Sequence, residues 1–314
     1  MSSIIKVNNL YHEYTIKNNG KKEKKVALKG INFEVKQGEV FGLLGPNGAG
    51  KTTTIKILTT LLIPKNGNVT LLDKDILKSP GYIRKNINFM LGGERGIYNR
   101  LTPIEYLKYF SLLYKIKIPD NKLMELLELV GLEKNANEET IGFSKGMKQR
   151  LHIARVLINN PKIVFLDEPT IGLDPVISEE VRLIISRLSK KNITVILTTH
   201  YMQEADDLCD RIAIIDEGEI KIIGTPTFIK STHSDVKFYE VTCSNLDEVG
   251  IFSVEEIRNL AIKTIEGGLK LIRFEYPVTS TIKEVQKEIN QFCSIIKINI
   301  RDVTLEDAYI KLVR

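Results

Sequence analysis

The stretch GPNGAGKTT, residues 45–53, constrains this chain more than any other feature. It follows the apolar run EVFGLLG (39–45), which predicts a buried strand, and it opens the segment 52–62, which predicts a helix that stops before Pro64. Its glycines let the backbone turn N–H groups toward an anion, and a helix N-terminus adds partial positive charge. The match to G-x-x-x-x-G-K-T in a strand–loop–helix setting therefore predicts a phosphate-binding loop.

The phosphate loop also predicts individual roles. Lys51 has the length to reach the β- and γ-phosphates of a nucleotide, and the Thr52 hydroxyl suits a magnesium ion bound with it. The other residues expected to contact the nucleotide here are Gly45, Pro46, Asn47, Gly48, Ala49, Gly50 and Thr53.

Two later strands are expected to end in chemically active side chains. The apolar run IVFL leads into Asp167 and Glu168, and TVILTT leads into His200. Parallel strands end at one edge of a sheet, where ligands gather. We therefore expect Asp167 to hold the metal or its coordinated water, Glu168 to act as general base, and His200 to bind the γ-phosphate. A surface acidic pair and a structural histidine are the alternatives for the same residues.

The order of apolar runs divides the chain near residue 225. Short strands alternate with amphipathic helices over the first 220 residues, which predicts an α/β fold, and helices near 103–115, 120–130 and 145–159 predict a helical subdomain at about 93–158. Beyond Pro226 we expect strands near 236–243, 269–276 and 295–301, with helices near 254–263, 280–291 and 304–312. The expected domains are 1–225 and a small C-terminal α/β domain at 226–314.

Composition indicates the kind of environment and partners that the chain has. No apolar run approaches the roughly 18 residues that span a bilayer, and the N-terminus does not resemble a signal peptide. The three cysteines lack paired spacing, so we expect reduced thiols. The net charge is +6, and its sharpest cluster is KNNGKKEKK at 17–25. A solvated loop is the simplest interpretation of this cluster, and contact with anionic lipid headgroups is an alternative. Without interleaved aromatic residues, we expect no nucleic-acid partner.

The segment FSKGMKQRL (143–151) resembles the signature of ABC ATPases, and it lies 20 residues before Asp167 when counted from Met147. The segment IGLD, ending in Asp174, resembles the D-loop of the family, and His200 resembles its switch histidine. These motifs follow the phosphate loop in the family's order, so the resemblance is specific, and it covers about residues 3–225. It implies a P-loop NTPase of the ABC ATPase type, with a RecA-like core and a helical insertion.

In that family ATP lies between two domains that face head to tail, each phosphate loop meeting the signature of the other copy. The resemblance therefore implies contacts to the partner's ATP from Ser144, Lys145, Gly146 and Met147, with the Ser144 side chain and the Gly146 N–H at the γ-phosphate. One chain carries one set of motifs, so a homodimer or a pairing with a similar chain is expected.

The position of Tyr14 matches the family's aromatic residue that stacks on adenine, although the lysine cluster stretches its spacing to Gly45. Tyr11 is a nearby competitor, and an ordinary strand-end tyrosine is the other alternative.

The signature and the magnesium shell both depart from the family's pattern. Lys145 replaces a glycine and Met147 a glutamine, while the residues expected to contact phosphate remain. Gly92 stands where the family has a glutamine that coordinates magnesium. Either Glu94 substitutes for it or water completes the metal shell.

The segments GGERG (92–96) and VTLEDAYIKL (303–312) resemble efflux ATPases that carry a small C-terminal domain. We therefore expect the ATP- and Mg²⁺-dependent ATPase subunit of an ABC exporter. It would be cytoplasmic, peripheral on the inner face of the cell membrane, and would grip a separate permease through a cleft beside residues 88–100. A soluble ABC ATPase that assembles another complex is the alternative. The sequence does not indicate the exported substrate.

Overall fold

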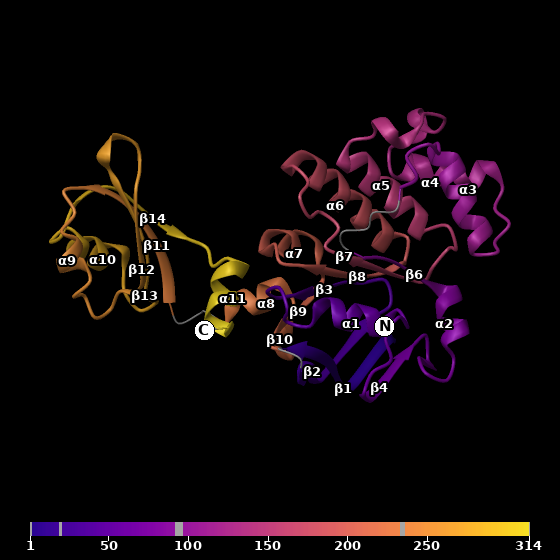
Figure 1. Ribbon diagram of the computed structural model, residues 1–314. Coiled ribbons are helices and arrows are strands. Elements are labelled where there is room, and N and C mark those ends of the chain that lie inside the picture. Colours follow the sequence, from indigo (N-terminus) through magenta and orange to yellow (C-terminus); the bar gives the residue numbers. More distant parts are fainter. Residues whose placement is uncertain (1, 19–20, 92–96, 233–235, 314) are drawn as a thin grey trace. The chain divides into compact units, whose positions relative to one another are not determined.

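The computed structural model describes residues 2–18, 21–91, 97–232 and 236–313, and it divides the chain into two compact units, Met1–Pro226 and Thr227–Arg314. Figure 1 shows the elements of both units along the chain. Within the described residues, no helix combines the length and the apolar composition needed to cross a bilayer.

A six-stranded sheet forms the centre of the first unit, in the order β10-β9-β3-β8-β7-β6. All neighbouring strands are parallel except β9 and β10, which form an antiparallel hairpin around Glu217-Gly218. Strands β3, β7 and β8 are buried along their whole length, as expected of apolar runs in a parallel sheet. The strands are β3 (Val40–Leu44), β6 (Ile87–Met90), β7 (Ile163–Asp167), β8 (Thr194–Thr199), β9 (Arg211–Asp216) and β10 (Glu219–Gly224).

Helices cover this sheet and form the expected insertion. Helix α1 (Lys51–Leu58) lies between the central sheet and a second sheet, and its apolar residues join both in one core (Figure 1). The inserted helices are α3 (Pro103–Leu113), α4 (Asp120–Leu129) and α5 (Lys145–Val156), with 3₁₀ turns at Glu133–Asn135 and Thr140–Gly142. The remaining helices are α2 (Pro80–Asn86), α6 (Pro175–Lys190) and α7 (Met202–Leu208).

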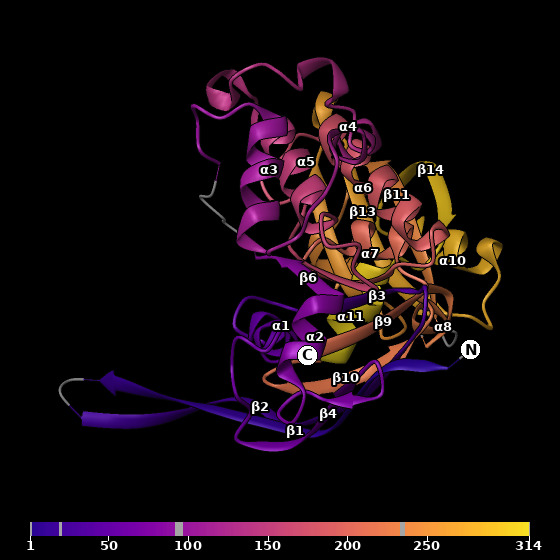
Figure 2. The ribbon, with the colours of Figure 1, turned by 90° about the vertical axis from the view of Figure 1, so that its right-hand side faces the viewer.

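The second sheet of this unit corrects the prediction of a lysine-rich loop. Its order is β2-β1-β4-β5, formed by β1 (Ser3–Asn18), β2 (Lys21–Lys36), β4 (Asn66–Leu71) and β5 (Lys74–Asp75). Strands β1 and β2 pair as far as Asn18 and Lys21, so 17–25 is largely strand. β-favouring residues such as Thr15 and Ile16, and a 2.7 Å ion pair between Lys24 and Glu13, extend the hairpin. Its outer part projects from the sheet (Figure 2).

The second unit is an antiparallel sheet in the order β12-β13-β11-β14. The sequence of elements β11-α9-β12-β13-α10-β14 is that of a ferredoxin-like split βαβ unit. The strands are β11 (Val236–Ser244), β12 (Arg258–Thr264), β13 (Lys270–Pro277) and β14 (Ser294–Arg301). The helices are α8 (Pro226–Ser231), α9 (Glu248–Ile251), α10 (Ile282–Ile289) and α11 (Leu305–Val313), with a 3₁₀ turn at Glu266–Gly268.

The helix expected near 254–263 is wrong, because β12 occupies most of that range. Leu260 and Ile262 alternate with more polar residues and pack on the core of this unit, which is the period of a strand. Leu260 and Ile262 therefore belong to a two-residue repeat at a sheet edge and not to a helical face.

Candidate functional site

The phosphate loop connects β3 to α1 and is held in a conformation that requires glycine. Gly50 has φ 114°, and a Cβ there would lie 2.8 Å from the carbonyl oxygen of Ala27. A Cβ on Gly45 would lie 2.0 Å from the carbonyl oxygen of Ile215. Any larger residue at either position would push the loop backbone away from the backbone of the neighbouring strand. The loop is therefore clamped between β2 and β9, and it presents the N-terminus of α1 to the site.

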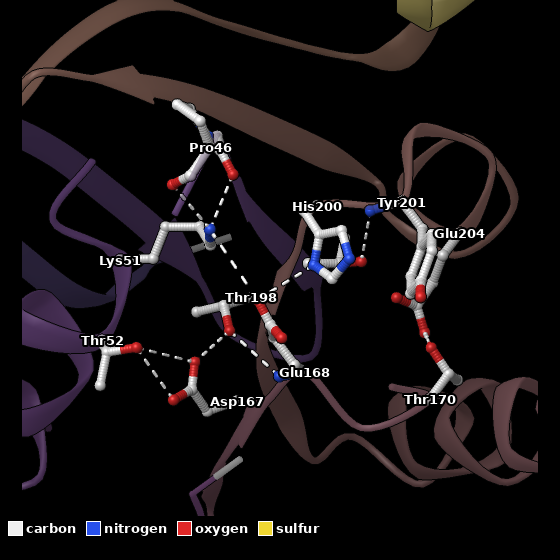
Figure 3. A network of polar contacts seen from close by, with 12 residues as sticks. Pro46, Lys51, Thr52, Asp167, Glu168, Thr170, Thr198, His200, Tyr201 and Glu204 are labelled. Atoms are coloured by element: carbon white, nitrogen blue, oxygen red, sulfur yellow. Dashed lines mark hydrogen bonds and ion pairs between the residues drawn. The ribbon is translucent and has the colours of Figure 1, made fainter. Parts of the chain in front are cut away.

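Lys51 is almost fully buried, with 5% of its surface exposed. Its Nζ donates to the carbonyl oxygens of Gly45 at 2.7 Å and Pro46 at 3.1 Å, and lies 3.9 Å from Oε1 of Glu168 (Figure 3). Burial lowers the pKa of Lys51, and the nearby carboxylates of Glu168 and Asp167 oppose that shift. The ammonium group is thus fixed over the loop by two carbonyl oxygens.

Asp167 ends β7 beside the first turn of α1. Its Oδ2 accepts a hydrogen bond from Thr52 Oγ1 at 3.1 Å, and its Oδ1 accepts one from Thr198 Oγ1. Thr198 lies directly opposite Asp167 in the parallel pairing of β7 and β8. The structure therefore brings together the two residues, Thr52 and Asp167, that the sequence predicts as metal ligands. Their oxygen atoms are of the type that Mg²⁺ prefers.

Glu168 adopts a left-handed backbone conformation, with φ 50°. Its N–H donates to both the carbonyl oxygen of Thr198, at 3.0 Å, and the hydroxyl oxygen of Thr198, at 3.1 Å. Its Oε1 lies 3.1 Å from Nδ1 of His200, which directly follows β8 (Figure 3). Non-glycine residues in this conformation cost free energy and persist only where their surroundings hold them. Here Thr198 holds the backbone while His200 meets the side chain.

The two candidate tyrosines of β1 have different neighbours. The hydroxyl of Tyr14 lies 3.3 Å from Oγ1 of Thr53 in α1, so this ring lies beside the phosphate loop. The Tyr11 hydroxyl instead donates to Glu13 on its own strand at 3.1 Å. The geometry favours Tyr14 as the residue near a bound nucleotide.

The signature residues form a separate group at the start of α5. Ser144 caps this helix by accepting a hydrogen bond from the Met147 N–H at 3.2 Å. Lys145 Nζ donates to the carbonyl oxygen of Gly172 at 3.1 Å. Gly146 is buried, and Asp174 caps α6 through the Ile177 N–H at 3.0 Å.

Within the described part of the chain, no hydrogen bond or ion pair joins residues 144–147 to Lys51, Asp167, Glu168 or His200. The expected substitute ligand Glu94, and Gly92 with it, lie outside the described residues.

Three polar residues of this region were missed from the sequence. Thr198 was discoverable, because aligning the parallel strands IVFLD and TVILT places it opposite Asp167. Glu204 accepts a hydrogen bond from Thr170 Oγ1 at 2.7 Å, and Gln149 Nε2 donates to the carbonyl oxygen of Pro169. No local pattern marks the last two contacts, because each joins segments that only the fold brings together.

A groove of about 700 Å³ lies beside the start of β6, within the first unit. Its lining combines apolar residues, such as Leu61 and Phe89, with the basic residues Arg84 and Lys115. Its lining residues are Thr59, Thr60, Leu61, Arg84, Lys85, Ile87, Asn88, Phe89, Tyr114, Lys115, Ile116 and Asn159. The groove therefore lies between α2, the start of β6 and the segments that follow α1 and α3, and Asn88 and Phe89 are the residues of 88–100 that line it.

Comparison with known proteins finds relatives that are ATP-binding proteins of ABC transporters or of drug resistance and export. The family model for ABC transporters matches residues 28–171. The linearmycin resistance ATP-binding protein LnrL of Bacillus subtilis is 34% identical over 296 residues, covering 92% of this chain and 94% of LnrL. A fluoroquinolones export ATP-binding protein of Mycobacterium tuberculosis is 43% identical over 210 residues, covering 66% of this chain and 68% of that protein.

Solved structures agree in fold. An ATP-binding cassette solved as a dimer in a post-hydrolysis state with ADP and Pi is 27% identical, with a TM-score of 0.62, covering 70% of this chain and 98% of that chain. The cbiO1 protein of Clostridium perfringens, part of an ABC transporter complex, is 28% identical with a TM-score of 0.64, covering 74% of this chain and 92% of that one.

Proposed function

The chain belongs to the ATP-binding proteins of ABC transporters, and from that premise we propose that it is the ATPase subunit of an exporter that drives a separate membrane permease. Relatives named for linearmycin resistance and for fluoroquinolone export support the direction of transport. The proposed working location is the cytoplasmic face of the cell membrane. In this proposal residues 1–225 are the ATP-binding domain, with a helical subdomain at about 93–158, and 226–314 are an accessory domain.

The observation that carries this proposal is that four side chains lie close together beside the phosphate loop: Lys51, Asp167, Glu168 and His200. Lys51 and the N–H groups of 45–53 would hold the phosphates, and Tyr14 would stack on the adenine. The Thr52 hydroxyl and the Asp167 carboxylate, 3.1 Å apart, fit a magnesium ion that would neutralise phosphate charge when bound.

The Glu168 carboxylate is placed to take a proton from an attacking water, since it is held at the strand end beside Lys51. His200, hydrogen-bonded to the same carboxylate, would orient it and contact the γ-phosphate.

The separation of the signature from this site supports a dimer as the active form. Ser144 and Gly146 lie at the N-terminus of α5, whose N–H groups and dipole suit an anion. Because they make no contact to their own chain's Lys51 or Glu168 among the described residues, we propose that they complete the site of a second copy or of a similar chain, with Lys145, Met147 and Asp174 at the same interface. Dimeric relatives of the same fold support this arrangement.

The groove beside β6 is the proposed docking site for the permease. Its apolar lining residues suit a short amphipathic segment, and its Arg84, Lys85 and Lys115 favour acidic residues on that segment. Helix α1 runs from the phosphate loop to Thr59 at this groove, so it would connect the docked segment to the nucleotide site.

The test is capture of the permease from gently solubilised membranes of the source cells, with the tagged Glu168→Gln chain and ATP as bait. We expect a stoichiometric multi-span membrane protein, identified by mass spectrometry. Leu61→Glu, at a groove residue 53% exposed, should abolish capture, while Ile63→Glu, 71% exposed and outside the groove lining, should not. Capture of a soluble complex alone would favour the assembly ATPase instead.

A further inference from the structure

A buried hydrogen bond lies behind the catalytic residues, between Thr170 and Glu204. Thr170 Oγ1 donates to Glu204 Oε1 at 2.7 Å, and the two residues are 5% and 2% exposed (Figure 3). Thr170 belongs to the turn after β7, and Glu204 to the first turn of α7. The bond therefore joins two segments that lie 34 residues apart in the sequence.

Each of these segments begins at a proposed catalytic residue. The turn is tight, because the Ile171 N–H donates to the Glu168 carbonyl oxygen at 3.2 Å and the Leu173 N–H to that of Thr170 at 3.1 Å. Thr170 is therefore fixed relative to Glu168, and the same turn leads on to Asp174.

The other segment is similarly constrained. Helix α7 starts two residues after His200, and its first turn is closed by a hydrogen bond from the Ala205 N–H to the Tyr201 carbonyl oxygen at 3.3 Å. Glu204 is thus held about one helical turn from His200. The Thr170–Glu204 bond therefore links the two segments that begin at Glu168 and His200, whose side chains lie 3.1 Å apart.

Stability alone gives a weak reason for this carboxylate. Burial raises the pKa of Glu204, with the hydroxyls of Thr199 and Thr170 opposing the shift. In the described chain Glu204 makes no ion pair within 4 Å, and Arg182 of α6, whose charge acts on it, is bonded to Glu179. A buried carboxylate without an ion-pair partner costs free energy. What the carboxylate provides, and an apolar side chain would not, is a hydrogen-bond acceptor for the Thr170 hydroxyl.

We propose that Glu204 is a positioning residue for ATP hydrolysis, which acts through Thr170 to keep Glu168 and His200 in register. This positioning role rests on the proposed functions of Glu168 and His200. In it, the Thr170–Glu204 hydrogen bond makes the turn that leads to Asp174 and the helix that follows His200 move together. Neither Thr170 nor Glu204 contacts the nucleotide in this proposal, so their loss should reduce the rate of hydrolysis and leave binding intact.

The test compares the full-length chain with Thr170→Val, which is isosteric and lacks the donor, and Thr170→Ser, which keeps it. Thr194→Val is the matched control, because Thr194 is also fully buried and its hydroxyl accepts from the Gly38 N–H at 2.9 Å at the opposite end of β8. We expect kcat to fall about tenfold in Thr170→Val, the equivalent of a hydrogen bond to a charged group. ATP affinity should be unchanged, Thr170→Ser should restore kcat, and Thr194→Val should lower the melting temperature without lowering kcat.

A second arm removes the acceptor. Glu204→Leu should lower kcat as much as Thr170→Val, and the double variant should lose no more than either one alone, because all three lack the same bond. A fall in kcat that Thr170→Ser does not restore, or an equal fall in Thr194→Val, would overturn the positioning role. If Glu168→Gln hydrolyses ATP normally, the proposed base is wrong instead, so the two failures are distinguishable.

Discussion

The phosphate-loop site and the signature segment are built in contrasting ways, although both are proposed to touch the same kind of nucleotide. Around Lys51 the polar side chains bind one another: Thr52 to Asp167, Thr198 to Asp167, and His200 to Glu168. At 144–147, among the described residues, the side-chain bonds run to the segment's own helix and to the carbonyl oxygen of Gly172. The first site is assembled within one chain, whereas the second is proposed to act on the nucleotide of a second copy.

This difference predicts which changes act on one chain and which act on the dimer. A change near Lys51 should alter chemistry even when dimerisation is normal. A change near Ser144 should leave ATP binding by the single chain intact and alter only what requires two chains.

Glu168→Gln should reduce ATP hydrolysis by about 10²–10⁴-fold, the usual contribution of a general base. Glutamine has the same shape and keeps the backbone bonds to Thr198, so ATP binding and ATP-dependent dimerisation should persist. Steady-state hydrolysis and size-exclusion chromatography with ATP measure the two properties. Near wild-type turnover would show that another group accepts the proton.

Mild acid should destabilise the folded chain through a buried histidine of the helix that carries the signature. His152 of α5 is buried against the Tyr106 hydroxyl at 3.1 Å, and burial lowers its pKa to about 4. Its ordinary pKa is 6.5, so between these values the unfolded chain binds more protons. Stability is then lost as the pH falls below 6.5, by about 2 kcal/mol at pH 5.

Urea unfolding of the wild type and of His152→Gln at pH 7 and pH 5 measures this loss. The variant should show a smaller decrease between the two pH values. His12, whose pKa burial also lowers, provides the comparison, because it lies in the second sheet and not in the inserted helices. An unchanged decrease in His152→Gln would place the acid-sensitive group elsewhere.

The sequence was sufficient for the phosphate-loop site because its constraints are local or follow from strand order. The G-x-x-x-x-G-K-T pattern specifies its own turn, and parallel pairing brings Asp167 and Thr198 together once both strands are recognised. The contact between Thr170 and Glu204 has no such local signal. It depends on how α7 packs behind the turn, which spacing along the chain does not determine.

The two errors of secondary structure have a common physical origin. At 17–25 the charge suggested a loop, but cross-strand pairing continued the hairpin through the lysines. At 254–263 the apolar residues suggested a helix, but pairing with β13 selected a strand. In both places a neighbouring strand supplied hydrogen bonds that local propensity does not reveal, which is why β-structure is the harder part to predict.

Gly146→Ala should impair the dimer more than the single chain. A Cβ at this position would lie 2.3 Å from Cγ2 of Ile177 in α6, so either the Ile177 side chain or the start of α5 must shift. Overpacking of this kind costs about 1–3 kcal/mol, and we expect roughly tenfold slower hydrolysis with unchanged ATP binding by the single chain. Gly142→Ala is the matched control, since its Cβ would meet nothing within 4 Å. Equal activity in both variants would argue that the start of α5 does not form part of the site.

Lys145→Ala should have the smallest effect, although it lies next to Gly146 and departs from the family's pattern. Its ammonium is exposed and bonded to the Gly172 carbonyl oxygen, a contact of the kind that contributes little in water. Hydrolysis should stay within about threefold of the wild type, because the Ser144 hydroxyl and the Gly146 N–H remain. A loss as large as that of Gly146→Ala would instead mean that the lysine binds the partner's nucleotide. The lysine that replaces the family's glycine would then add a phosphate contact. The signature half of the site would include this side chain as well as the first N–H groups of α5.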